Sequence, residues 1–212
     1  MTDEQQKPKS RVWRRPSKKW LLGIPLGGFI AFVLGTVALG TTNYIVHETS
    51  KTEFCYVCHS HQEFIRPEYE ASSHFMNTAG VRAGCADCHL PHDNWFELMW
   101  TKAVVSLDII PEVMGKLDTQ EKYDSHRAEL AEIVWRQFKA NDSKFCHSCH
   151  DIAAMDLAAQ DRVASRRHSQ AIEKGQTCID CHYGIVHRPP DNAEEILDKI
   201  TAEIGGKDGA SD

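Results

Sequence analysis

The chain of 212 residues has no cysteine outside four short motifs and no charged residue between Leu21 and Val46. Because the motifs use all eight cysteines, no thiol is left for another purpose. The sequence also lacks a convincing run of alternating apolar and polar residues, which is the pattern of a half-buried β-strand. We therefore predict a mainly α-helical fold, whose informative features are the cysteine motifs and the uncharged segment.

Each of the four motifs has the pattern Cys-x-x-Cys-His. They are Cys55-Tyr-Val-Cys58-His59, Cys85-Ala-Asp-Cys88-His89, Cys146-His-Ser-Cys149-His150 and Cys178-Ile-Asp-Cys181-His182. Two thiols at this spacing can add to the vinyl groups of a porphyrin while the adjacent imidazole reaches the iron. Disulfides or zinc sites could also use eight cysteines, but neither requires a histidine directly after every pair. The motifs therefore predict four covalently bound haem c groups.

The segment before the first motif predicts a membrane anchor. Residues 1–20 carry seven basic side chains and two acidic ones, and the uncharged residues 21–46 that follow are long enough to span a bilayer. Trp13, Trp20 and Tyr44 suit the two membrane interfaces. The basic residues predict a cytoplasmic tail over 1–20 and a single-pass anchor over 21–46 in a bacterial inner membrane, with everything after it in the periplasm.

A cleaved signal peptide is the alternative, since it also joins a basic region to an apolar one. The apolar segment here is longer than the usual stretch of about 7–15 residues, and no clear Ala-x-Ala site follows it. An uncleaved anchor is therefore favoured. We interpret Arg14-Arg15 as topology charge rather than a twin-arginine signal, because haem is attached to an unfolded chain after translocation.

Residues 47–204 form the predicted periplasmic haem domain, and residues 205–212 have the composition of a disordered tail. Outside the first twenty residues the chain has 17 basic and 28 acidic side chains. This balance argues against nucleic acid and suits a protein partner with a basic docking face. The sequence is also compatible with a homo-oligomer.

The motifs come as two similarly spaced pairs. They begin at residues 55, 85, 146 and 178, and each pair has a histidine before and after its second motif. These flanking histidines are His74 and His92 in the first pair, and His168 and His187 in the second. We therefore predict a loop-rich, haem-packed domain made of two dihaem halves, at about residues 47–110 and 140–190.

The four flanking histidines are the expected sixth ligands of the irons. A second imidazole gives a low-spin, low-potential centre that suits electron transfer. For any single histidine a solvated side chain is the safer interpretation, but four in matching places for four haems favour ligation. His92 is too close in sequence to His89 to share its iron comfortably, so we expect crossed ligation. The expected pairs are His187 with His150, His92 with His59, His74 with His182, and His168 with His89.

Helical patterns cover Thr119 to Ala140, Ala154 to Lys174 and Asp191 to Ile204. The apolar stretch Asn94 to Pro111 is too short for a second span and is either an interfacial helix on the membrane or a buried helix. Its ionisable residues Lys102 and Asp108 would lie about 120° apart on a straight helix. These two side chains could act at the same site only with a bend or a helix end between them.

Together these features resemble the NapC/NirT family of membrane-anchored tetrahaem quinol dehydrogenases. The similar parts are the anchor, the paired motifs, Gly80-Val-Arg-Ala-Gly-Cys85-Ala-Asp-Cys-His89-Leu-Pro and Thr177-Cys-Ile-Asp-Cys-His182-Tyr-Gly-Ile-Val-His187. The resemblance implies that menaquinol or ubiquinol is oxidised near haem 1 and that electrons pass to a periplasmic reductase in anaerobic respiration, most often a nitrate reductase. It also implies that Lys102 and Asp108 lie by haem 1, with Asp108 as proton acceptor and Lys102 as hydrogen-bond donor.

One position departs from the family pattern. Many relatives have methionine two residues after the first haem histidine, and in some of them it ligates haem 1, but this chain has His61 there. Haem 1 is therefore held by His59, by His61 with His92, or has an open face. A multihaem terminal reductase or a general periplasmic electron-transfer hub is the alternative function. All four motifs are regular, which counts against a reductase, and with no appended domain expected after Pro190 the hand-off would be direct.

Overall fold

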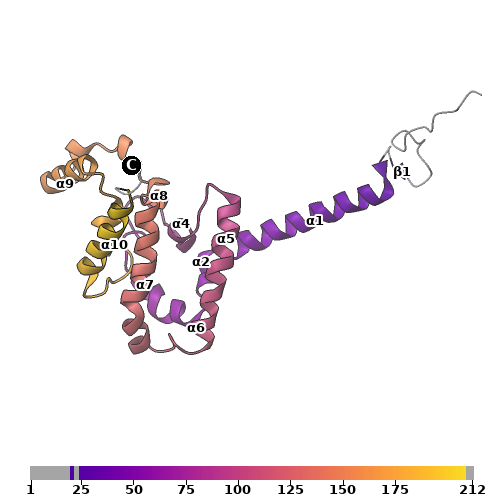
Figure 1. The fold of residues 1–212 in the computed structure, drawn as a ribbon, viewed down its shortest axis with the longest axis horizontal. Helices are drawn as coiled ribbons and strands as arrows, with labels where there is room; N and C mark the ends of the chain where they lie inside the picture. The colour runs from indigo at the N-terminus through magenta and orange to yellow at the C-terminus, as the bar shows by residue number, and fades with distance from the viewer. Residues whose placement is uncertain (1–19, 22–23, 209–212) are drawn as a thin grey trace, which may run out of the picture. The chain divides into compact units, whose positions relative to one another are not determined.

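The computed structural model describes residues 20–21 and 24–208, and it describes side chains over residues 26–204 (Figure 1). The chain divides into two compact units, Met1–Glu48 and Thr49–Asp212. Most of the predicted cytoplasmic tail, residues 1–19, lies outside the described residues.

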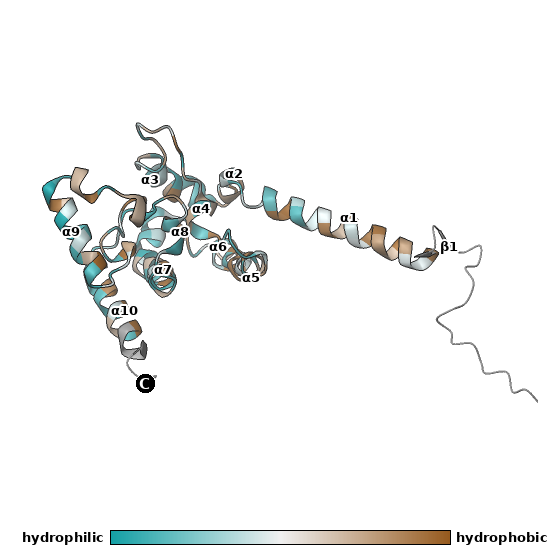
Figure 2. Cartoon of the chain, turned by 90° about the horizontal axis from the view of Figure 1, so that it is seen from above, coloured by the Kyte–Doolittle hydropathy of each residue, from teal (hydrophilic) through white to brown (hydrophobic). Residues whose placement is uncertain are grey.

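The first unit contains a short hairpin and one long helix. Strand β1 (Trp20–Leu21) pairs antiparallel with β2 (Ile24–Pro25), and helix α1 follows over Leu26–Glu48. Helix α1 begins after Pro25, because a residue that precedes a proline is disfavoured in the helical conformation. Among the described residues, α1 is the one helix whose length and composition would allow it to cross a membrane, and apolar residues recur along it in Figure 2.

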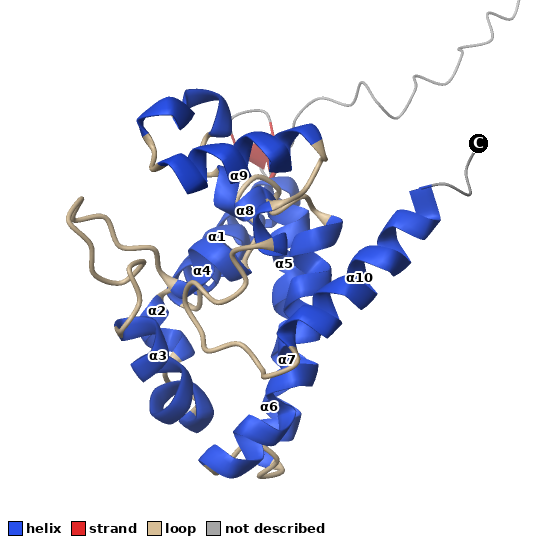
Figure 3. Cartoon of the chain, turned by 90° about the vertical axis from the view of Figure 1, so that its left-hand side faces the viewer, coloured by secondary structure: helices blue, strands red, loops and turns tan. Residues whose placement is uncertain are grey.

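The described part of the second unit has only helical elements, which confirms the mainly α-helical prediction (Figure 3). Long loops, tan in Figure 3, separate short helices that carry the cysteine motifs. The elements are α2 (Thr52–Cys55), the π-helix η2 (His61–Ile65), α3 (Arg66–Glu70), α4 (Cys85–His89), α5 (Trp95–Val105), η3 (Ser106–Asp108), α6 (Ile109–Val113), α7 (Gln120–Ala140), α8 (Lys144–His147), η4 (Ile152–Ala154), η5 (Leu157–Ala159), α9 (Arg162–Glu173), η6 (Cys178–Asp180) and α10 (Ala193–Asp208).

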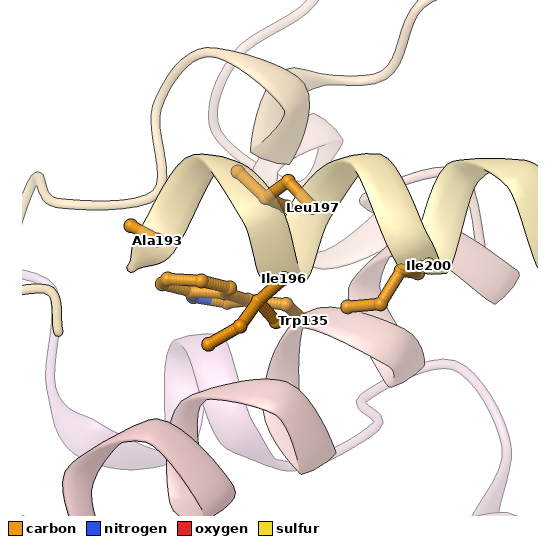
Figure 4. Packing of buried hydrophobic residues seen from close by; sticks show 5 residues of the cluster. All are labelled: Trp135, Ala193, Ile196, Leu197 and Ile200. Carbon is orange, nitrogen blue, oxygen red and sulfur yellow. The ribbon is translucent and has the colours of Figure 1, made fainter. Parts of the chain in front are cut away.

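A small apolar core lies where α10 packs on α7 (Figure 4). Helix α10 contributes residues at the spacing of one helical face, and α7 contributes Trp135. Ile200 is fully buried. The α10 residues of this core are Ala193, Ile196, Leu197 and Ile200.

Three of the predicted helices need comment. Helix α7 matches its prediction, and Thr119 caps it by accepting a hydrogen bond from the Lys122 backbone. Helix α9 begins later than predicted, because Asp161 caps it and two short 3-10 turns take up the residues before. Helix α10 continues to Asp208, so the prediction of a disordered tail from residue 205 is wrong for residues 205–208; residues 209–212 lie outside the described part.

Candidate haem sites

Short helical turns hold the four motifs. In the third and fourth motifs the backbone N–H of the histidine donates to the backbone carbonyl of the first cysteine, over 2.8 Å for His150 and 2.9 Å for His182. All eight cysteines are free thiols that are half-buried or exposed, and all four motif histidines keep an exposed surface. The motifs therefore present their thiols and imidazoles to open space, as attachment to a porphyrin requires.

The second and fourth motifs share a local hydrogen-bonding device. The aspartate between their cysteines accepts a hydrogen bond from the backbone three residues before it, from Gly84 to Asp87 over 2.7 Å and from Thr177 to Asp180 over 2.9 Å. Lys139 of α7 also donates to Asp180 over 2.5 and 2.6 Å. The second and fourth motifs therefore begin with the same local turn.

Three pairs of histidine rings face each other across similar gaps. Each pair joins one motif histidine with one flanking histidine. Two imidazoles on opposite sides of one iron have ring centroids about 6 Å apart, since each nitrogen lies about 2 Å from the metal. The observed centroid distances are 6.2 Å for His74 and His150, 6.4 Å for His89 and His187, and 6.0 Å for His168 and His182. Each pair therefore has the spacing to hold one haem iron.

These pairs differ from the predicted crossed pairs, so the predicted pairing is wrong. His168 pairs within its own half, whereas the loop after the fourth motif brings His187 back to the second motif. The flanking histidines of the two halves therefore do not behave alike, although they occupy matching places in the sequence. The structure places His187 with His89 rather than His150, His74 with His150 rather than His182, and His168 with His182 rather than His89.

Burial favours the neutral form of three of the paired imidazoles, those of His74, His89 and His187. Surrounding protein desolvates the His89 ring, although the residue keeps an accessible surface, and lowers its pKa to about 4. Burial also lowers the pKa of His74 and of His187. Neutral imidazole is the form that binds a metal.

The first motif is surrounded differently. The ring of His59 contacts Phe64 edge-on at 5.6 Å. His92, predicted to face His59, instead donates from Nε2 to the Asp87 carbonyl over 3.2 Å, and its ring lies 6.5 Å from Phe145. An Nε2 that carries a proton for this hydrogen bond cannot bind iron at the same time. His92 Nε2 therefore has a backbone partner in the second motif.

His61 lies beside two carboxylates. Its Nδ1 is 3.3 Å from the Ser60 hydroxyl, and the backbone N–H of Ser60 donates to Glu112 over 2.9 Å. Burial lowers the pKa of His61, while the negative charges of Glu112 and Asp108 oppose that effect. The turn after the first motif thus joins α6 through Glu112.

Lys102 and Asp108 both lie near the first motif, and a helix end separates them. Helix α5 ends at Val105, and Asp108 lies in the next 3-10 turn. Lys102 donates to the Thr49 carbonyl over 3.0 Å and to its hydroxyl over 2.9 Å. Burial lowers the pKa of Lys102 and Cys55 opposes the shift, whereas desolvation by neighbouring protein raises the pKa of the exposed Asp108 and His61 opposes it.

Thiols of successive motifs are neighbours. Cys55 and Cys85 share a hydrogen bond, which raises the pKa of Cys55 and lowers that of Cys85 to about 7. Burial, followed by the charge of Cys178, raises the pKa of Cys146 to about 11. Cys88 of the second motif is in electrostatic reach of Cys149 in the third. The four attachment sites therefore form one continuous row in chain order.

Four regular attachment motifs and three facing imidazole pairs define a multihaem c-type cytochrome. The chain belongs to the NapC/NirT cytochrome c family, whose N-terminal region matches residues 15–192. This confirms the resemblance stated from the motifs, and with it the expectation of covalently bound haem c.

Curated relatives agree over most of this chain. The c-type cytochrome TorY of Haemophilus influenzae is 45% identical over 82% of this chain, which spans only 47% of that relative. A putative tetrahaem cytochrome of Allochromatium vinosum is 45% identical over 78% of this chain and 89% of its own length. NapC of Escherichia coli K12 is 40% identical over 86% of this chain and 89% of its own length. No solved structure matches the chain.

Proposed function

We propose that the protein is a membrane-anchored tetrahaem cytochrome c that oxidises membrane quinol and passes the electrons to a periplasmic reductase. The observation that carries the proposal is the set of three facing imidazole pairs, each beside a regular attachment motif. Two histidine ligands close both faces of an iron, so these centres suit electron transfer rather than substrate binding. The apolar helix α1 supports a single-pass anchor, with the N-terminus in the cytoplasm and the haem domain in the periplasm.

The proposed ligand set follows the observed geometry. Haem c is held through the eight motif cysteines and through the motif histidines His59, His89, His150 and His182. His187, His74 and His168 close the second, third and fourth irons respectively. His92 is left out, because its Nε2 donates to a backbone carbonyl. Haem 1 is the exception, with His59 and His61 beside it and no facing histidine from a distant segment among residues 24–208.

The surroundings of the first motif support quinol oxidation there. Helices α5 and α6 expose large apolar side chains, among them Phe96 (78% exposed), Trp100 (72%) and Val113 (80%). Lys102 ties α5 to Thr49, the residue that directly follows α1 in the chain. We propose this apolar surface beside the first motif as the place where a quinol meets haem 1.

Lys102 and Asp108 supply the polar groups for the reaction. Oxidation of one quinol to quinone releases two protons and two electrons. When bound, the haems accept these electrons one at a time. Asp108 takes a proton at a carboxylate oxygen, and its raised pKa makes it a better acceptor than an ordinary aspartate. Lys102 donates a hydrogen bond to the quinone oxygen.

The partner is proposed from the relatives. Names among them include NapC, TorY and a denitrification system component, NirT of Stutzerimonas stutzeri, which is 37% identical over 86% of this chain. We propose a reductase of the nitrate type as the acceptor, with menaquinol or ubiquinol as donor. The acidic balance outside the anchor suits a basic docking face on that acceptor.

The test compares quinol oxidation by purified protein and its variants in detergent. Asp108→Asn should slow haem reduction by a quinol about 10² to 10⁴-fold, the usual contribution of a positioned base, and Lys102→Gln should also slow it. Glu203→Gln removes an exposed carboxylate that pairs with Arg136 and serves as the matched control. Unchanged rates in the first two variants, with full haem content, would remove both residues from the site.

A further inference from the structure

The Nδ1 atoms of two distal histidines, His187 and His168, have different environments. When Nε2 of an imidazole binds iron, Nδ1 carries a proton and needs an acceptor, and that acceptor tunes the metal. His187 Nδ1 is buried without a hydrogen-bond partner, and Glu68 Oε2 lies 3.9 Å away. A movement of about 1 Å would bring this pair to hydrogen-bonding distance.

Glu68 is fixed by groups from two other segments. Arg127 of α7 donates to both of its carboxylate oxygens, over 2.8 and 3.1 Å. The backbone N–H of Arg188 donates to it over 3.0 Å, and Arg188 directly follows His187. Only 7% of the Arg127 side chain is exposed, and Asp124 also accepts from it over 2.7 Å. The carboxylate is therefore held in place beside the ligand.

His168 offers a comparison within the same molecule. Its Nδ1 donates to Gln160 Oε1 over 2.6 Å, so its acceptor is a neutral amide. A carboxylate is the stronger acceptor, because a charge-assisted hydrogen bond is about twice as strong as a neutral one. His168 therefore has a neutral acceptor within hydrogen-bonding distance, whereas His187 has a carboxylate 3.9 Å from its Nδ1.

We infer that Glu68 is a positioning residue for haem 2: it accepts a hydrogen bond from His187 Nδ1 and lowers the midpoint potential of that haem. The bond makes the imidazole a more basic ligand, which stabilises the ferric state. Glu68 and Asp124 balance Arg127 and Arg188 in charge, so the cluster adds no net charge beside the haem in the unmodified protein. Gln160 holds His168 in the same way without the charge. The inference rests on the proposed pairing of His187 with His89.

Redox titration of the full-length holoprotein in detergent tests this inference. Glu68→Gln should shift the ferric to ferrous equilibrium of one haem at least tenfold toward ferrous, which is about 59 mV for one electron. Glu68→Asp should restore part of the shift. Glu70→Gln is the matched control, because Glu70 lies on the same helix and pairs with Arg66 over 2.7 Å. It should leave all four potentials unchanged.

The reciprocal variant keeps the test independent of the Arg127 network. Gln160→Glu should move one haem, that of His182, toward ferric by a similar factor. The inference is overturned if neither Glu68→Gln nor Gln160→Glu moves a potential in a protein with full haem content. A His187→Ala variant separates this failure from failure of the ligation, because loss of one low-spin signal in it supports His187 as a haem ligand. An unaltered spectrum would reject the pairing itself.

Discussion

Replacing Arg127 with alanine should destabilise the haem domain more than any change at an exposed ion pair. The guanidinium is 7% exposed and donates to Glu68, to Asp124 and to the Arg188 carbonyl over 2.9 Å. Its loss leaves Glu68, whose side chain is 20% exposed, without its main partner. The contact joins α3, α7 and the loop that carries His187.

The magnitude follows from this burial. Removing one member of a buried ion pair costs about 3–5 kcal/mol. Because Asp124 is 34% exposed, water can compensate part of that loss, and we expect the lower end, about 3 kcal/mol. For a domain of this size that corresponds to a fall in Tm of about 6–12 °C.

Thermal unfolding followed by far-ultraviolet circular dichroism measures the change. Arg136→Ala is the matched control, because Arg136 lies on the same helix, is 33% exposed and pairs with Glu132 and Glu203. An exposed pair of this kind contributes about 0–1 kcal/mol. The reasoning is refuted if Arg127→Ala melts within about 2 °C of the unmodified protein, or no lower than Arg136→Ala.

Two further predictions concern the core and the cofactor. Ile200→Ala shortens a fully buried side chain of α10 and should lower the free energy of unfolding by about 2–5 kcal/mol. Denaturant titration measures this loss, and a value below about 1 kcal/mol would show that the core is not tightly packed. Replacing both Cys178 and Cys181 with serine should reduce covalent haem from four groups per chain to three by pyridine haemochrome assay, and retention of four would place the fourth attachment elsewhere.

Local patterns in the sequence were sufficient for the apolar helix and α7, and they also predict the haem attachment sites. Each depends on residues close together in the chain: two cysteines separated by two residues, a long uncharged run, and a helical spacing capped by Thr119. The sequence also indicates that Lys102 and Asp108 can act together only if a helix end or a bend separates them, and α5 ends between them at Val105.

The histidine pairs were not predictable in the same way. His187 reaches His89 only because the loop before α10 returns to the second motif, and no local pattern encodes that path. Glu68 and Gln160 were missed for a related reason. Each is an ordinary polar residue on its own segment, and its proximity to a distal histidine appears only in the folded chain.

The end of α10 shows the limit of residue propensities. Glycines at 205 and 206 favoured an end at Ile204, yet the helix continues to Asp208. A glycine costs a helix about 1 kcal/mol relative to alanine, which is a weak signal against hydrogen bonds that are already in place along the preceding turns.

Reduction of the purified, full-length protein by a menaquinol analogue, with no other protein present, tests the proposed function most directly. We expect the haem absorption to change to that of the ferrous form, with two haems reduced for each quinol consumed, and the Asp108→Asn variant to be reduced far more slowly. If dithionite reduces the haems fully while the quinol leaves them oxidised, the protein does not take its electrons from quinol and the proposed function is wrong.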